Sequence, residues 1–319
     1  MRRRMRGSAV AGAAAAAVCA LTVAVAVAVP PAGGTTGHPA VRPAARADAV
    51  AADCTDPEAG LRPQTVDGPA VQRIKDRGRL IAGVDQNSYR WGYRDPASRE
   101  LNGFDIDLVH AIAKALLGDP DKVSFLAIPT NQRIPAVQKG KVDIIVRTMT
   151  ISCDRIKQVA FSTAYFETGQ QLLAPKGSPI TAYDDSLRGK TVCAAKGSTA
   201  EGQLKKDSHG ASVLTVPNQL DCLVRLQLGQ VDAVLTDSAL AAGQAAQDPS
   251  VRLVGKPFTT ESYGVAMNLK DEDLVRRVNA VLEDYRRGGD GSPWMTAYRK
   301  WLAADLKGIT APPEPKYRD

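Results

Sequence analysis

The sequence predicts an α/β protein with two lobes, each built on a mostly parallel sheet. Two successive runs of alternating strands and helices indicate this fold class, one over residues 79–174 and one over residues 191–254. Repeated βα alternation favours parallel strands with helices on both faces. The 319 residues are enough for two domains of ordinary size. Because ligands bind at the carboxyl ends of such strands, two facing lobes would place a ligand in the cleft between them.

The first 52 residues are expected to precede the folded part. Residues 1–29 begin with Met-Arg-Arg-Arg-Met-Arg and continue with small and apolar residues, a pattern typical of a secretory signal or of a membrane anchor. Residues 30–52 are rich in Pro, Ala, Gly and Thr and lack periodicity, which predicts a disordered linker. Lipidation at Cys19 is the least favoured alternative. The protein is therefore expected to be secreted or extracytoplasmic, with N-terminal membrane anchoring left open.

Charge and motif content exclude several classes of function. Residues 1–52 carry a net charge of +5, from Arg2, Arg3, Arg4, Arg6, Arg42 and Arg46 against Asp48, so +2 of the total of +7 remains for residues 53–319. Without a basic domain, nucleic-acid binding is not expected. The sequence contains no Cys-x-x-Cys, its three histidines are scattered, and no Gly-x-Gly-x-x-Gly is present. We therefore expect no metal and no cofactor.

Four cysteines lie beyond the signal region, and an even number in an exported protein suggests disulfides. Four cysteines allow three pairings. Cys193 and Cys222 lie in the same later segment, which favours their pairing with each other. Cys54 would then attach the N-terminal extension, residues 53–70, to Cys153. The alternative of four buried free thiols is disfavoured in an oxidising compartment.

Strands and helices follow one another in the first run and again after it. Helices are expected over residues 71–77 and from about residue 104, ended by Gly78 and Gly118. The other elements expected before residue 190 are strands at 79–84, 123–128, 142–146, 159–161 and 171–174, with a short helix before the turn at Gly140. Beyond residue 190 we expect strands at 191–195, 212–216, 231–235, 251–254 and 264–268, and helices at 219–228, 271–287 and 293–302.

Arginines and hydroxyls gather where the strand at 142–146 ends. The exit loop contains Arg147, Thr148, Thr150 and Arg155, and Arg133 begins the preceding helix. Planar guanidinium groups bind carboxylates through two parallel hydrogen bonds, and hydroxyls complete such a shell. The loop therefore predicts a carboxylate site. On spacing alone, solvated surface arginines and helix-capping hydroxyls remain an alternative.

A second group of polar residues follows the strands of the later run. Gly197, Ser198 and Thr199 precede a helix, where free backbone N–H groups could hold an anion. Asp237 follows the strand at 231–235. An ordinary helix cap would equally explain each of these residues.

The combined motifs resemble family 3 of the extracellular solute-binding proteins, which bind polar amino acids for ABC importers. The matching segments cover roughly residues 71–303 and are Leu101-Asn-Gly-Phe-Asp-Ile-Asp-Leu, Val142-Asp143, Thr148-x-Thr150 with Arg155, Val231-Asp-Ala-Val-Leu-Thr-Asp237, Tyr263-Gly264-Val265 and the helix from Trp294 to Trp301. The extension with Cys54 and the Pro-rich tail look closest to the actinobacterial glutamate-binding branch.

The resemblance implies a type II periplasmic-binding-protein fold, with two Rossmann-like lobes and a two-segment hinge. Lobe 1 would comprise residues 71–170 and 262–303, lobe 2 residues 171–261, and the C-terminal tail residues 304–319. It implies a monomeric binding protein rather than an enzyme, which closes on an amino acid and presents it to an ABC permease. Two alternatives remain: a subunit that reports the ligand to a membrane sensor protein, and a dehydratase-like enzyme on the same fold.

The resemblance also assigns roles to individual residues. Arg155 would bind the ligand α-carboxylate, helped by Thr150, Ser198 and Thr199. Asp237 would accept from the α-ammonium group, aided by the Thr148 carbonyl.

At the distal end of the ligand, Arg133 and Thr130 would hold a side-chain carboxylate. Arg147 would either bind that carboxylate as well or only line the cleft. Asp85 would then need a cationic partner, either Arg133 or Arg147. L-glutamate or L-aspartate is the expected ligand.

Overall fold

The computed structural model describes residues 54–319. The expected signal or anchor segment (1–29) and linker (30–52) lie outside the described residues. Between residues 54 and 319, no helix combines the length and the apolar character needed to cross a membrane.

Lobe 1 is built on a five-stranded sheet in the order β5-β1-β6-β15-β7. The strands β5, β1 and β6 are parallel, whereas β15 runs antiparallel to both of its neighbours. The bounds of these strands are β1 (Leu80–Val84), β5 (Val123–Ala127), β6 (Ile144–Ile145), β7 (Ala160–Phe161) and β15 (Ala266–Met267). A small antiparallel sheet lies beside them, formed by β2 (Asn87–Ser88), β3 (Gly92–Arg94) and β4 (Leu101–Asn102).

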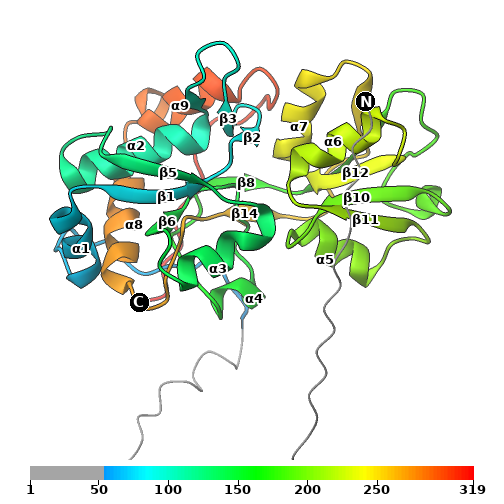
Figure 1. Cartoon of the computed structure of the whole chain (residues 1–319). Coiled ribbons are helices and arrows are strands. Elements are labelled where there is room, and N and C mark those ends of the chain that lie inside the picture. Colours follow the sequence, from blue (N-terminus) through cyan, green and yellow to red (C-terminus); the bar gives the residue numbers. More distant parts are fainter. Residues whose placement is uncertain (1–53) are drawn as a thin grey trace, which may run out of the picture. The chain divides into compact units, whose positions relative to one another are not determined.

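Helices cover both faces of the lobe 1 sheet (Figure 1). Four of them share one core with the strand residues Leu80, Ala82 and Val84: α1 (Pro69–Arg77), α2 (Phe104–Leu117), α8 (Glu272–Arg286) and α9 (Pro293–Trp301). The opposite face packs Ile145 and Ala266 against Ala136 and Val137 of α3 (Arg133–Gln138). Short helical turns complete the lobe, namely η1 (Thr130–Gln132), α4 (Cys153–Ile156) and η3 (Gly289–Gly291).

Lobe 2 repeats this plan with the strand order β11-β10-β12-β9-β13. Its strands are β9 (Gln170–Pro175), β10 (Thr191–Ala195), β11 (Ser212–Val216), β12 (Ala233–Asp237) and β13 (Val251–Val254). Its helices are α5 (Thr199–Lys206), α6 (Gln219–Gln227) and α7 (Ser238–Gln247), with a 3₁₀ turn η2 (Asp185–Leu187). Val192 and Ala194 face α5, whereas Cys193 and Val234 face α6 and α7, as expected from the two-residue period of strands.

Two antiparallel strands join the lobes. The strands β8 (Phe166–Thr168) and β14 (Glu261–Tyr263) pair from Phe166–Tyr263 to Thr168–Glu261. Figure 1 shows this pair between the two five-stranded sheets. The chain therefore passes from one lobe to the other in two adjacent segments, as the hinge expected from the sequence requires.

Some expected elements differ in extent. The apolar run 142–146 contributes only Ile144–Ile145 as strand, although Asp143 N and Val146 N still donate to carbonyls of β1. The strand expected at 264–268 is limited to Ala266–Met267. The strand expected at 231–235 instead spans Ala233–Asp237, so that Asp237 belongs to the strand itself.

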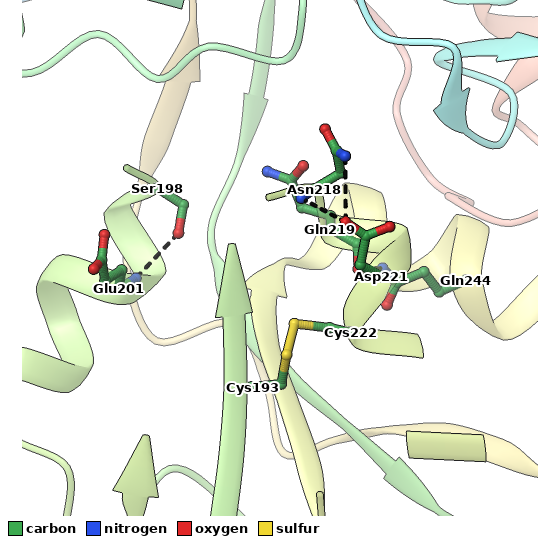
Figure 2. The surroundings of a disulfide bond; sticks show 8 residues. All are labelled: Cys193, Ser198, Glu201, Asn218, Gln219, Asp221, Cys222 and Gln244. Atoms are coloured by element: carbon green, nitrogen blue, oxygen red, sulfur yellow. Dashed lines mark hydrogen bonds between the residues drawn. A yellow bond between two sulfur atoms is a disulfide. The ribbon is translucent and has the colours of Figure 1, made fainter. Parts of the chain in front are cut away.

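Both expected disulfides are present, Cys54–Cys153 and Cys193–Cys222. The second joins β10 to the first turns of α6 in the interior of lobe 2 (Figure 2). The first attaches the N-terminal extension to the start of α4. A parallel bridge pairs Gly60 of this extension with Tyr317 of the C-terminal tail, so that the two ends of the described residues lie together on lobe 1.

Candidate ligand-binding site

The predicted site residues lie where parallel strands of the two sheets end. In lobe 1, β1 leads into Asp85, β5 into Thr130 and β6 into Arg147. In lobe 2, β10 leads into the start of α5, β11 into the start of α6, and β12 ends at Asp237. Loops leave an open α/β sheet at these edges, which explains why side chains far apart in sequence meet here.

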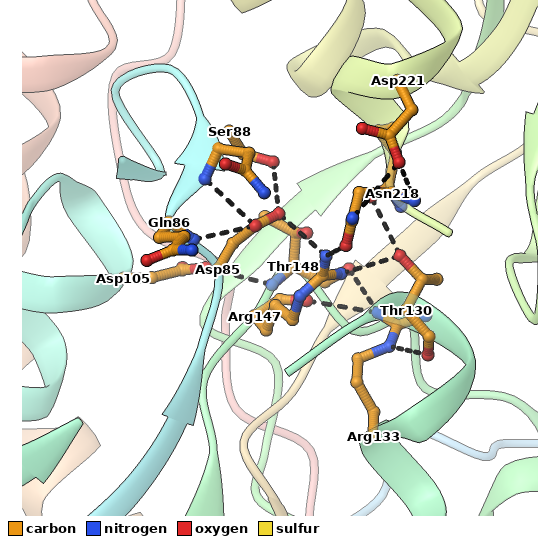
Figure 3. A network of polar contacts seen from close by, with 12 residues as sticks. Asp85, Gln86, Ser88, Asp105, Thr130, Arg133, Arg147, Thr148, Asn218 and Asp221 are labelled. Atoms are coloured by element: carbon orange, nitrogen blue, oxygen red, sulfur yellow. Dashed lines mark hydrogen bonds and ion pairs between the residues drawn. The ribbon is translucent and has the colours of Figure 1, made fainter. Parts of the chain in front are cut away.

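Arg147 forms the centre of a buried polar cluster (Figure 3). Its Nη2 lies 2.9 Å from Asp85 Oδ2, and the two side chains are 0% and 5% exposed. Its Nη1 donates to Thr130 Oγ1 (3.0 Å). Asp85 also accepts from Ser88 Oγ (2.7 Å). The cationic partner of Asp85, expected to be Arg133 or Arg147, is therefore Arg147.

The same cluster reaches lobe 2. Arg147 Nη2 also donates to Asn218 Oδ1 (3.1 Å), and Thr130 Oγ1 donates to Gln219 Oε1 (3.1 Å). Asp221 orients Asn218 by accepting from its backbone N and from its Nδ2 (Figure 3). With its charge balanced by Asp85 and its hydrogen bonds spanning both lobes, Arg147 is better suited to hold the lobes together than to bind a distal carboxylate.

Arg133 is buried beside this cluster but interacts differently. Its Nε donates to the carbonyl of Thr130 (3.0 Å), and its Nη1 donates to those of Arg147 (3.2 Å) and Thr148 (3.4 Å). Within residues 54–319 no carboxylate lies within ion-pair distance of its guanidinium. Burial lowers the pKa of Arg133 well below its ordinary value, and the charges of Arg155 and Arg147 lower it further. An added anion would therefore be stabilised here.

Thr148 has an unusual backbone conformation, and its amide donates to buried side chains of lobe 1. Its φ is 41°, in the left-handed region that a β-branched residue seldom adopts. Its N–H donates to Asp105 Oδ2 (3.0 Å) and to Tyr165 Oη (3.2 Å), and Tyr165 in turn donates to Asp105 Oδ1 (2.9 Å). Burial raises the pKa of Asp105 to about 7. Asp105 and Tyr165 thus hold the strained turn between the arginine cluster and Thr150.

Arg155 of α4 also links the lobes. Its Nη1 donates to the carbonyl of Thr150 (2.7 Å), and its Nη2 donates to that of Gly197 in lobe 2 (3.1 Å). No carboxylate between residues 54 and 319 pairs directly with it. Burial lowers the pKa of Arg155, opposed by the charges of Glu261 and Asp237. Of the three buried arginines at the site, only Arg147 therefore has a carboxylate of the described chain as partner.

Glu261 of β14 is a buried site residue that the sequence did not indicate. Its Oε2 accepts from Thr150 Oγ1 (2.6 Å) and from Thr199 Oγ1 (2.9 Å), one hydroxyl from each lobe. Its Oε1 accepts from Gln170 Nε2 (2.6 Å). A charged residue two positions before the Tyr263-Gly264 landmark was the available signal, but it has meaning only once β14 is placed between the lobes.

Asp237 closes the site on the lobe 2 side. It does not cap α7 through its side chain; instead Oδ2 accepts from Tyr263 Oη (2.7 Å). Burial raises the pKa of Asp237 to about 8, and the charge of Glu261 raises it further, against the lowering effects of Tyr263 and Arg155. A cationic group placed against Asp237 would favour the ionised carboxylate.

The two remaining predicted residues, Ser198 and Thr199 at the start of α5, have different hydrogen-bond partners. Ser198 caps the helix, since its Oγ accepts from Glu201 N (3.1 Å) (Figure 2). Its hydroxyl therefore has a structural partner, whereas Thr199 points toward Glu261. The sequence also missed Asn218 and Gln219. Their place after β11, equivalent to that of Ser198 after β10, could have marked them.

A family model describing bacterial extracellular solute-binding proteins, family 3, matches residues 80–304. The chain belongs to this family. It is 39% identical over 232 residues to the ABC transporter glutamine-binding protein GlnH of Bacillus subtilis, which covers 73% of this chain and 84% of that protein. It is 29% identical over 246 residues to the glutamate/aspartate import solute-binding protein of Salmonella typhimurium, covering 74% of this chain and 80% of that protein.

Solved structures of related proteins have the same fold. The solute receptor for L-cysteine of Neisseria gonorrhoeae superposes with a TM-score of 0.72 at 28% identity, covering 76% of this chain and 99% of that chain. The two-lobed type II binding-protein fold expected from the sequence is therefore confirmed. Family membership makes the chain an extracytoplasmic amino-acid-binding protein of the ABC-importer class and not an enzyme.

Proposed function

We propose that this protein binds L-glutamate or L-aspartate and presents the closed, ligand-bound form to an ABC importer. The observation that carries the proposal is the charge balance of the site. Arg133 and Arg155 are buried cations without a carboxylate partner in residues 54–319, whereas Arg147 is already paired with Asp85. An amino acid with two carboxylates would supply one carboxylate to Arg133 and the other to Arg155.

The expected orientation of the ligand follows from the positions of the charged groups. The α-carboxylate would lie on Arg155, the α-ammonium on Asp237, and the side-chain carboxylate on Arg133. Because Arg155 already donates to the carbonyl of Gly197 in lobe 2, a ligand carboxylate bound to Arg155 would lie where the two lobes meet. Ligand contacts made in both lobes stabilise the closed form by differential affinity, and the importer would recognise that form.

L-glutamine is the second candidate ligand, and the 39% identity to a glutamine-binding protein favours it. A glutamine side chain would offer Arg133 an amide oxygen instead of a carboxylate. The two ligands differ by one charge at one position. Arg133 is therefore the residue at which the two hypotheses separate.

Calorimetry on the purified protein tests the proposal, with glutamate, aspartate, glutamine, asparagine and arginine titrated separately. We expect an acidic amino acid to bind most tightly and its amide to bind about tenfold or more weakly, because the amide lacks the charge that Arg133 needs. An Arg133→Met variant should lose most of this preference. Tighter binding of glutamine than of glutamate by the unmodified protein would replace the acidic ligand with the second candidate.

A further inference from the structure

Glu261 lies where two of the predicted ligand-binding hydroxyls, those of Thr150 and Thr199, meet. Thr150 Oγ1 of lobe 1 and Thr199 Oγ1 of lobe 2 both donate to Glu261 Oε2, at 2.6 and 2.9 Å. The remaining oxygen, Oε1, accepts from Gln170 Nε2 (2.6 Å). Glu261 as a whole residue is 7% exposed, and it belongs to the strand β14 that joins the lobes. Glu261 thus reaches both lobes from the connection between them.

The direction of these hydrogen bonds limits what the hydroxyls can do for a ligand. A threonine hydroxyl has one proton to donate and two lone pairs, whereas an ionised carboxylate can only accept. The protons of Thr150 and Thr199 are therefore directed to Glu261. Toward a ligand, both hydroxyls present lone pairs, which accept hydrogen bonds. They suit an ammonium group and repel a carbonyl or carboxylate oxygen.

We infer that Glu261 is a positioning residue that makes the site selective for an α-ammonium over an α-keto group, by keeping the hydroxyl protons of Thr150 and Thr199 away from the ligand. The inference rests on the proposed amino-acid ligand. It changes the expected role of Thr150 and Thr199, which the family resemblance assigned to the α-carboxylate. Arg155 and the backbone N–H groups at the start of α5 then remain for the carboxylate.

The neighbouring groups agree with an ammonium subsite at this position. Asp237, held by Tyr263 Oη, provides a second acceptor from lobe 2. Tyr263 and Glu261 belong to the same short strand, so one element orients both the aspartate and the two hydroxyls. A keto acid of the same carbon skeleton would place an oxygen lone pair among acceptors only.

The test compares an amino acid with its keto acid in wild type and in a Glu261→Met variant. The probes are L-glutamate and 2-oxoglutarate, and the quantity is the ratio of their dissociation constants measured by calorimetry. Methionine is of similar length but has no comparable acceptor, so that the threonine hydroxyls become free to donate. We expect the ratio of the 2-oxoglutarate constant to the glutamate constant to fall by about tenfold or more.

Two further variants separate polarity from packing. Glu261→Gln keeps an acceptor oxygen for the hydroxyls. Gln170 can present its Oε1, which has no hydrogen-bond partner among residues 54–319, to the new amide. This variant should retain most of the selectivity. Ser262→Ala is the matched control, because Ser262 is also buried in β14 but donates to Glu58 (2.7 Å) and not to the site. In Ser262→Ala, the ratio of the 2-oxoglutarate dissociation constant to the glutamate dissociation constant should equal that of wild type.

A purely structural role of Glu261 gives a different result. In that case Glu261→Met would weaken both ligands by the same factor and leave the ratio unchanged, which would overturn the inference. Should this variant fail to fold, Thr199→Val provides the same test, since Thr199 is only partly buried. Because Thr199→Val loses an acceptor, it should weaken the binding of glutamate more than the binding of 2-oxoglutarate. Equal weakening of both ligands would again refute the positioning role of Glu261.

Failure of the proposed acidic specificity would be visible separately. If wild type binds glutamine and not glutamate, the ligand assignment is wrong, and the selectivity ratio is measured with L-glutamine and 2-oxoglutaramate instead. The Glu261 variants then test the same hydroxyl polarity, because both pairs differ only at the α-position.

Discussion

Arg155 donates to one carbonyl in each lobe while its charge has no carboxylate partner in residues 54–319. A ligand carboxylate placed there would form charge-assisted hydrogen bonds in a site shielded from water. We predict that Arg155→Met lowers ligand affinity by about 100-fold or more, since losing such a buried partner costs about 3 kcal/mol. Calorimetry measures the change, with the exposed Arg188→Met as control. If the affinity of Arg155→Met stayed within twofold of wild type, Arg155 would not be a ligand-binding residue.

Asp237 makes binding dependent on pH. Burial, followed by the charge of Glu261, raises its carboxyl pKa to about 8 in the ligand-free protein, while an ammonium ligand requires the ionised form. Affinity should therefore rise by up to about tenfold per pH unit below about pH 8 and level off above it. Binding near neutral pH should also release close to one proton, measured by calorimetry in two buffers. An affinity independent of pH would contradict the role of Asp237.

The same pKa shift predicts how stability depends on pH without ligand. The folded carboxyl binds a proton more tightly than the unfolded one, whose pKa is 3.8. Its stabilising contribution is therefore complete below about pH 4 and is lost as pH rises through about pH 8. Asp105, whose pKa burial raises to about 7, acts in the same direction. In wild type we expect the unfolding temperature to fall as the pH rises from about 4 to about 8. In Asp237→Asn this fall should be smaller, but it should not disappear, because Asp105 still contributes.

The turn between β10 and α5 brings the two lobes into close approach. Gly197 has φ of 78°, and a Cβ added to it would lie 2.9 Å from Asn131 Cα in η1 of the other lobe. We predict that Gly197→Ala hinders closure and lowers ligand affinity by about tenfold or more, in addition to a left-handed strain of about 1 kcal/mol. X-ray scattering with and without ligand should show a smaller ligand-induced compaction than in wild type.

Gly189 provides a matched control for this prediction. Its φ of 72° is nearly the same, but a Cβ there would meet no atom within 4 Å. Gly189→Ala should therefore lose a similar amount of stability and keep wild-type affinity. Equal affinity losses in the two variants would mean that backbone strain, and not contact between the lobes, causes the effect.

Local patterns in the sequence predicted most helices and strands correctly. Gly78 and Gly118 end α1 and α2 with left-handed φ values of 70° and 73°, as their positions after apolar periodic segments indicated. The run from Val142 to Val146 was misleading about length. Val142 and Val146 lie outside the strand Ile144–Ile145 but are buried and as apolar as the strand itself, so apolar composition alone does not mark its ends.

The polar site was predicted only in part, because its organisation depends on contacts distant in sequence. Arginine chemistry identified Arg133, Arg147 and Arg155 as a group, but only the fold separates the one paired with Asp85 from the two that lack a carboxylate partner in residues 54–319. Glu261 was missed for the same reason. The pairing of β14 with β8 connects segments almost a hundred residues apart, and no local pattern reports it.

Lobe 1 is completed by both ends of the described chain. Gly60 N donates to Lys316 O, and Arg318 N donates back to Gly60 O. Glu58 of the extension accepts from Ser262 Oγ of β14 and from Lys316 Nζ. The Cys54–Cys153 disulfide then fixes the extension to α4, the short helix that contains Arg155. The chain ends, the hinge strand and the site are thus physically connected.

The two disulfides should differ in how much they stabilise the whole molecule. Their sequence separations are 99 for Cys54–Cys153 and 29 for Cys193–Cys222. Removing a native disulfide costs about 2–5 kcal/mol, and the loop-entropy term alone makes the longer loop worth roughly 1 kcal/mol more. We therefore predict a larger loss of the free energy of unfolding in Cys54→Ala/Cys153→Ala than in Cys193→Ala/Cys222→Ala, measured by urea denaturation.

The burial of the cysteines adds a packing effect that must be distinguished from the loop-entropy effect in this comparison. Cys193 and Cys222 are fully buried, so their replacement also leaves small cavities that add to the loss. Each double variant retains a single disulfide, and reducing that disulfide removes one cross-link without deleting further side chains, which provides the control. If the Cys193–Cys222 pair still contributes more after this control, strain or residual structure in the unfolded chain, and not loop length, determines the contribution of each disulfide.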